Sequence, residues 1–134
     1  MGTIVVGYVP KPEGKAALRR AAEEARLRKL RLVVVNSHRG GREFDRDDAL
    51  ESETQLDEVK AELDGVGIEH EVRQLVRGFD PAEDLVDVAK EVSAELIVIG
   101  LRRRSPVGKL ILGSNAQRVL LDASCPVLAV KAEE

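Results

Sequence analysis

Five short apolar segments alternate with longer segments of helical periodicity along the chain. Four of the apolar segments are continuous and rich in β-branched residues, which is typical of strands buried on both faces of a parallel sheet. The third segment places both apolar and polar residues on each of its two faces. This mixed pattern predicts an edge strand with one face in water. The five predicted strands are Thr3–Gly7, Arg31–Asn36, Ile68–Val76, Leu96–Gly100 and Pro126–Lys131.

Segments with apolar residues at helical spacing occupy the gaps between these strands. One helix start has a strong local signal, because Asp80 is a capping type, Pro81 suits the first turn, and Glu83 can reach back to the cap. Two of the predicted helices cover residues 12–29 and 46–64. A third begins at Asp80, and a fourth begins near Gly113.

Strand–helix alternation implies right-handed βαβ units and a doubly wound sheet. With the third strand at an edge, the strand order 3-2-1-4-5 follows. We therefore predict one α/β domain over residues 1–134, a three-layer sandwich with a five-stranded parallel sheet of the Rossmann-like kind. In this order the winding reverses between the first and fourth strands, so a ligand is expected at their carboxyl ends, near Gly7 and Gly100.

Composition excludes several classes of function. A net charge of −3 and an aromatic content of 2% argue against a nucleic-acid binder, which needs positive charge and stacking platforms. No apolar run approaches the roughly 18 residues of a membrane span. A single cysteine, Cys125, excludes an internal disulfide. These features predict a cytoplasmic protein that binds neither nucleic acid nor membrane.

The segment that follows the fourth strand has the chemistry of an anion site. It carries three consecutive arginines at 102–104, whose forked guanidinium groups suit phosphate. It then enters a helix at Gly113-Ser114-Asn115, and the free N–H groups of a first helical turn carry partial positive charge. The chemistry and the predicted topology both indicate a phosphate-bearing ligand here. Serine and asparagine at this helix start could also serve simply as caps.

The last strand predicts an oligomer. Residues 126–131 read as fully buried, although the order 3-2-1-4-5 leaves them at an edge. An exposed apolar edge favours aggregation, and pairing with a second copy would cover it. We therefore expect a homodimer through residues 126–131.

With these segments in place, the whole chain resembles the universal stress protein family. Its nucleotide-binding members carry Gly, two residues, Gly, nine residues and then Gly-Ser or Gly-Thr after the fourth strand. Gly100 matches the first glycine, and Gly113-Ser114 match the closing pair. The resemblance implies the fold of the adenine nucleotide alpha hydrolase-like group and a nucleotide-binding, regulatory role in the stress response.

In members that bind ATP, the resemblance implies, this loop holds the ribose and phosphates. The end of the first strand supplies an Asp near adenine, and backbone after the second strand contacts the base. The nucleotide-binding residues implied in this chain are Tyr8, Val9, Pro10, Ser37, Gly100, Arg102, Arg103, Gly113, Ser114 and Asn115.

Two positions depart from the family pattern. Arg103 replaces the second glycine, and Val9 stands where the acid is expected. Arg103 either adds a guanidinium contact or fills the site. Tyr8 either stacks on a base or plugs the pocket. The ligand therefore stays open among ATP, ADP, AMP, cyclic AMP and another phosphate-bearing molecule. A triphosphate could bring a Mg²⁺ ion, for which the loop has no carboxylate.

No catalytic constellation is recognisable in the sequence, so an enzyme is not expected. Neither a Ser/His/Asp set nor a phosphate-binding loop of the Walker type can be assigned, since Leu110 stands where that motif needs a hydroxyl. Two other functions stay open: a ligand-free dimeric interaction protein with a degenerate pocket, and a weak nucleotide hydrolase.

Overall fold

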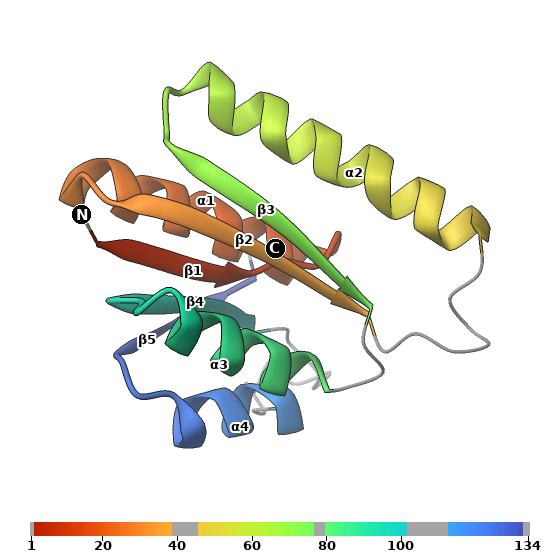
Figure 1. Ribbon diagram of the computed structural model, residues 1–134. Helices are drawn as coiled ribbons and strands as arrows, with labels where there is room; N and C mark the ends of the chain where they lie inside the picture. The colour runs from red at the N-terminus through yellow and green to blue at the C-terminus, as the bar shows by residue number, and fades with distance from the viewer. Residues whose placement is uncertain (1, 39–45, 77–79, 102–112, 133–134) are drawn as a thin grey trace.

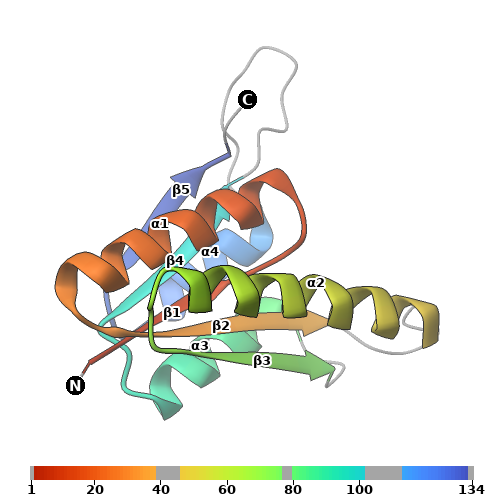
Figure 2. The same cartoon turned by 90° about the horizontal axis from the view of Figure 1, so that it is seen from above.

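The computed structural model describes residues 2–38, 46–76, 80–101 and 113–132. Within these ranges strands and helices alternate, and two pairs of helices cover the two faces of one sheet (Figures 1 and 2). The elements are β1 (Thr3–Gly7), α1 (Pro12–Arg28), β2 (Arg31–His38), α2 (Arg46–Gly65), β3 (His70–Val76), α3 (Pro81–Glu91), β4 (Leu96–Leu101), α4 (Ser114–Asp122) and β5 (Val127–Lys131).

The sheet is parallel and has the order β3-β2-β1-β4-β5, which confirms the predicted fold. The central strand β1 pairs with β2 on one side and β4 on the other, so that Val5 lies beside both Val33 and Ile97. The winding therefore reverses between β1 and β4, as the sequence indicated. The carboxyl ends of these two strands meet at one edge of the sheet.

Two hydrophobic cores lie on opposite faces of the sheet. One contains Ile4, Val6 and Leu32 and is covered by α1 and α2. The other contains Val5 and Ile97 and is covered by α3 and α4. Each of these five side chains is fully buried, and burial of one such side chain stabilises the fold by roughly 1.5–3 kcal/mol. Burial on alternate faces explains why these strands are continuously apolar in sequence.

The edge strand β3 differs from its prediction in two details. It begins at His70 rather than at Ile68. Both of its faces are partly covered, because Val72 packs against the first core and Leu75 against the second. The expectation of one face in water was therefore wrong: alternation divides the apolar residues of β3 between the two sides.

Helix α3 starts where the sequence predicted, but its capping is different. Asp80 occupies the N-cap position and Pro81 the first turn, yet the Asp80 side chain makes no capping hydrogen bond. Its carboxylate instead accepts a hydrogen bond of 2.7 Å from Arg118 of α4. Glu83, expected to reach back to the cap, also accepts one from Arg118, at 2.5 Å. The cross-helix ion pair takes the place of the local cap.

Across the described ranges, none of the helices combines the length and apolarity that crossing a membrane requires.

Candidate functional site

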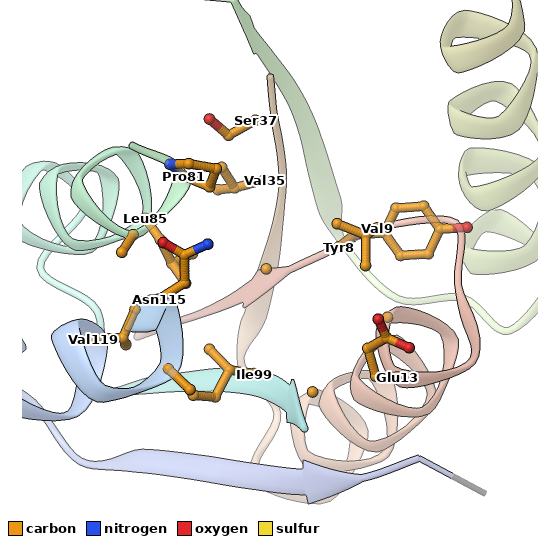
Figure 3. A pocket seen from close by; sticks show the side chains of 15 residues that line it. Tyr8, Val9, Glu13, Val35, Ser37, Pro81, Leu85, Ile99, Asn115 and Val119 are labelled. Carbon is orange, nitrogen blue, oxygen red and sulfur yellow. The ribbon is translucent and has the colours of Figure 1, made fainter. Parts of the chain in front are cut away.

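A pocket of about 160 Å³ opens at the carboxyl ends of β1 and β4 (Figure 3). The end of β1 and the start of α1 form one side, with Val9 and Glu13. The starts of α3 and α4 form the opposite side, with Leu85 and Asn115. The pocket therefore lies at the predicted point where the winding of the sheet reverses, which is the usual ligand position in open α/β sheets.

Close backbone packing closes the pocket beside α1. A Cβ atom on Gly14 would lie only 1.9 Å from the carbonyl oxygen of Val9. Glycine at this position therefore lets the first turn of α1 lie directly against the segment that leaves β1. As a result, Val9 is held at the rim of the pocket with 39% of its surface exposed.

The end of β1 is also fixed to β2. The Tyr8 N–H donates to the carbonyl of Val35 at 2.9 Å, and the buried side-chain amide of Asn36 donates to the carbonyl of Tyr8 at 3.1 Å. These bonds satisfy backbone groups just beyond the ladder of β1. The rim at Tyr8 and Val9 is thus positioned by the neighbouring strand.

The ring of Tyr8 points away from the pocket. Figure 3 shows the phenol directed toward α2, on the far side from Ser37 and Asn115. The side chain is 6% exposed and belongs to the core under α1 and α2. Burial, and to a smaller degree Glu58 and Glu62, raises the pKa of the phenol. Both predicted roles of the ring, stacking on a base and plugging the pocket, therefore disagree with its position.

Three other side chains bring polar groups to the described pocket wall: Glu13, Ser37 and Asn115. The Ser37 hydroxyl donates a hydrogen bond to the carboxylate of Asp84, a residue of α3 that is 1% exposed. The other carboxylate oxygen of Asp84, Oδ1, is buried and has no hydrogen-bond partner within the part of the chain that the structure describes. Sequence reasoning assigned no role to Glu13 or Asp84.

Helix α4 presents its first turn at the pocket. It begins at Ser114, with Gly113 at the N-cap and no side-chain capping bond, so a capping role for Ser114 or Asn115 is not observed. Asn115 lines the pocket, whereas Ser114 is exposed and Gly113 half-buried outside the lining. The N–H groups of a first turn have no partners within their own helix.

The structure thus gathers part of the predicted site. Tyr8, Val9, Ser37, Gly100 and Asn115 all line the pocket. Pro10 is exposed and does not line it. The predicted phosphate contacts Arg102 and Arg103 lie outside the described residues.

Arg118 joins the two helices that form one side of the pocket. Its guanidinium group contacts Asp80 and Glu83 of α3 and lies 3.8 Å from Asp122 one turn later on α4. These groups are partly exposed, so each pair contributes little stability by itself. Together these contacts link the start of α3 to the middle of α4.

Residues 2–38, 46–76, 80–101 and 113–132 contain no group of three or more His, Cys, Asp or Glu side chains suited to a metal ion.

The profile of the universal stress protein family matches residues 1–131. The chain belongs to this family. A universal stress protein of Mycolicibacterium smegmatis is 46% identical over 128 residues, which cover 96% of each chain. A solved universal stress protein from Archaeoglobus fulgidus is 44% identical, with a TM-score of 0.85 over 98% of this chain and 99% of its own.

One related structure bears on ligands. It is described as the universal stress protein from Archaeoglobus fulgidus in complex with dAMP. It is 38% identical to this chain, with a TM-score of 0.79 and 98% coverage of both chains.

Proposed function

We propose that this protein binds an adenine nucleotide in the pocket between β1 and β4, in a regulatory role in the stress response. The observation that carries the proposal is the pocket itself, which opens at the reversal point of the sheet beside the first turn of α4. The dAMP complex of a relative with 38% identity supports the choice of an adenine nucleotide.

In this proposal the base and ribose lie in the described pocket and the phosphate lies beyond it. About 160 Å³ is less than the roughly 300 Å³ at which sites for drug-sized ligands begin, so part of a nucleotide would extend outward. The first-turn N–H groups of α4, at Gly113, Ser114 and Asn115, would attract the phosphate. Arg102 and Arg103 would add charge, as their place in the sequence suggests.

The base would lie against the apolar part of the wall. Val35, Leu85 and Pro81 contribute apolar surface there, next to the polar side chain of Ser37 (Figure 3). An apolar wall with a small number of placed polar groups is the usual composition of a small-molecule site.

A ligand panel tests the proposal. Thermal unfolding is measured with ATP, ADP, AMP and cyclic AMP, each with and without Mg²⁺. A ligand at 100 times its dissociation constant should stabilise the fold by about 2.7 kcal/mol. If none of the four shifts the transition at millimolar concentration, the protein is a ligand-free member of the family. A Mg²⁺ effect confined to ATP would assign the ion to the triphosphate.

A matched pair of variants locates the site. Asn115→Asp places a negative charge in the first turn of α4 at the pocket, where it should favour the helix but repel the phosphate. Gln117→Glu adds the same charge to an exposed residue of α4 outside the lining. Calorimetric affinity should fall about tenfold in the first variant and by less than threefold in the second, as expected for about 1.4 kcal/mol of local repulsion. Equal losses would place the ligand elsewhere.

A further inference from the structure

Ser37 reaches the pocket from the α3 side of the sheet. Side chains alternate along β2, and Val33 and Val35 both belong to the core under α3 and α4. Ser37 follows them on the same face and lies at the end of β2, where it lines the pocket. Its hydroxyl is therefore directed between the sheet and α3.

Its partner there is a buried acid in the first turn of α3. Asp84 is 1% exposed, and among the described residues its carboxylate has one hydrogen-bond donor, the Ser37 hydroxyl. It lies in α3 between Ala82 and Leu85, both of which belong to the surrounding apolar core. A buried carboxylate with an unpartnered oxygen costs stability that an apolar residue would not. Such a group calls for an explanation other than packing.

The bond between these two residues determines what Ser37 can offer to a ligand. A hydroxyl has one proton and two acceptor positions. Because Ser37 donates its proton to Asp84, the oxygen can only accept hydrogen bonds from the pocket. A ligand atom placed against Ser37 must therefore be a donor, and a second acceptor at that position would be repelled.

We propose that Asp84 fixes the Ser37 hydroxyl as a hydrogen-bond acceptor and that this acceptor selects a purine with an amino group at C6. The inference rests on the proposed function and names the group of the base that the site reads. In adenine the C6 substituent is an amine and donates, whereas in hypoxanthine and guanine it is a carbonyl oxygen and accepts. Ser37 is the contact residue, and Asp84 is the positioning residue behind it.

The unmodified protein provides the first test. Calorimetry compares AMP with purine riboside 5′-monophosphate, which lacks the amine, and with IMP, which carries an oxygen in its place. Loss of one hydrogen bond should lower the affinity for purine riboside 5′-monophosphate about tenfold relative to AMP. The C6 oxygen of IMP faces another acceptor and should lower its affinity further. Equal affinity for the three nucleotides would overturn the inference and leave the proposed function intact.

Exchange of Asp84 for its amide tests the positioning role. The amide of Asp84→Asn can donate to Ser37, which frees the hydroxyl proton to point into the pocket. AMP should then bind more weakly and IMP more tightly, so that the ratio of their affinities falls at least tenfold. A role in stability alone would move both affinities in the same direction.

Two further variants act as controls. Asp87→Asn makes the same exchange at an exposed position of α3 and should leave the AMP/IMP ratio unchanged. Ser37→Thr retains the hydroxyl and should also retain the ratio. If Asp84→Asn does not fold, Ser37→Ala tests the same contact, because it removes the acceptor oxygen itself. In that variant the affinities for AMP and purine riboside 5′-monophosphate should lie within about twofold of each other.

The experiments distinguish failure of the proposed function from failure of this inference. Absence of binding by AMP and by every other adenine nucleotide overturns both the proposed function and this inference. Binding of AMP with a ratio that Asp84→Asn and Ser37→Ala leave unchanged overturns the inference alone.

Discussion

The backbone carbonyl oxygen of Glu13 lies so near Gly100 that a Cβ atom on the glycine would approach it to 2.0 Å. This contact seats the first turn of α1 on the end of β4, and both elements line the pocket. The sequence motif suggested a ligand-binding role for Gly100. The structure shows that backbone packing by itself excludes a side chain there.

Gly100→Ala should therefore destabilise the fold. The added methyl group meets backbone, which cannot turn aside as a flexible side chain would, so we expect a loss of about 2 kcal/mol or more in the free energy of unfolding. Urea unfolding measures it. Gly65→Ala, at the end of α2 with no atom within 4 Å of the new methyl, is the control and should change stability by at most about 1 kcal/mol, toward greater stability. Similar losses in both variants would contradict the packing role.

Val9→Asp should strengthen binding of AMP. The position lines the pocket at its rim and is 39% exposed, so a carboxylate can stay hydrated there. The resemblance to ATP-binding family members implies an acid near adenine at this place. One restored hydrogen bond of about 1 kcal/mol corresponds to roughly fivefold higher affinity by calorimetry. Purine riboside 5′-monophosphate, which has no donor at C6 or N1, is the comparison ligand and should gain nothing.

Glu71 should make stability depend on pH. The hydrogen bond from Arg73, together with the charges of Arg73 and Arg31, lowers the pKa of the Glu71 carboxyl. A pKa that is lower in the folded than in the unfolded state adds stability above the unfolded value of about 4.3, and this is lost as pH falls through the folded value. Because the side chain is 36% exposed, solvent screening limits the effect to about 0.5–1 kcal/mol.

Urea unfolding of Glu71→Gln measures this effect. The variant should be less stable than the parent protein at pH 7, and the difference should shrink below about pH 4. Glu69→Gln, at an exposed position before β3, should leave stability unchanged at both pH values. A difference for Glu71→Gln that persists at pH 3 would show that the pKa shift is not its source.

The homodimer through residues 126–131 stays a prediction. Strand β5 is an edge strand, and Val127 through Val130 are only half-buried. The Ile97 N–H donates to Pro126, and the Ala132 N–H donates to Leu101. Both of these bonds join even-numbered positions, Pro126 and Ala132, to β4. In a parallel ladder the N–H groups of the odd-numbered residues of β5 therefore face outward, where a second copy could pair with them.

Ala129→Pro removes one of those outward donors and should convert a dimer into a monomer without unfolding it, since proline is tolerated on edge strands. Light scattering after size exclusion gives the mass, and circular dichroism checks the fold. A parent protein that runs at the mass of one chain at high micromolar concentration would contradict the predicted interface.

The sheet could be predicted from sequence because its physics is local. Strands buried on both faces need continuous β-branched runs. The four such segments, and the third segment with its mixed pattern, all form strands within two residues of the expected bounds. The position of the Tyr8 ring was also within reach. Ile4 and Val6 of β1, and Tyr8 just after it, alternate onto one face, away from the pocket.

Asp84 and Glu13 could not be found in this way. Asp84 lies beside the apolar stripe of α3, and helical periodicity does not tell whether a residue at the margin of that stripe is covered by the sheet. Its contact with Ser37 joins residues 47 positions apart in the chain. The predicted capping of α3 was wrong for the same reason, because Arg118, 38 residues away, competes for the Asp80 carboxylate.

We expect the contacts of Arg118 to give the pocket a sensitivity to ionic strength that does not depend on the charge of its ligand. The guanidinium group holds the start of α3, which carries Pro81, against α4, which carries Asn115. Dissolved salt screens such partly exposed pairs, so these two walls would separate more readily in concentrated salt. Even an uncharged nucleoside such as adenosine would then bind less tightly as salt is added.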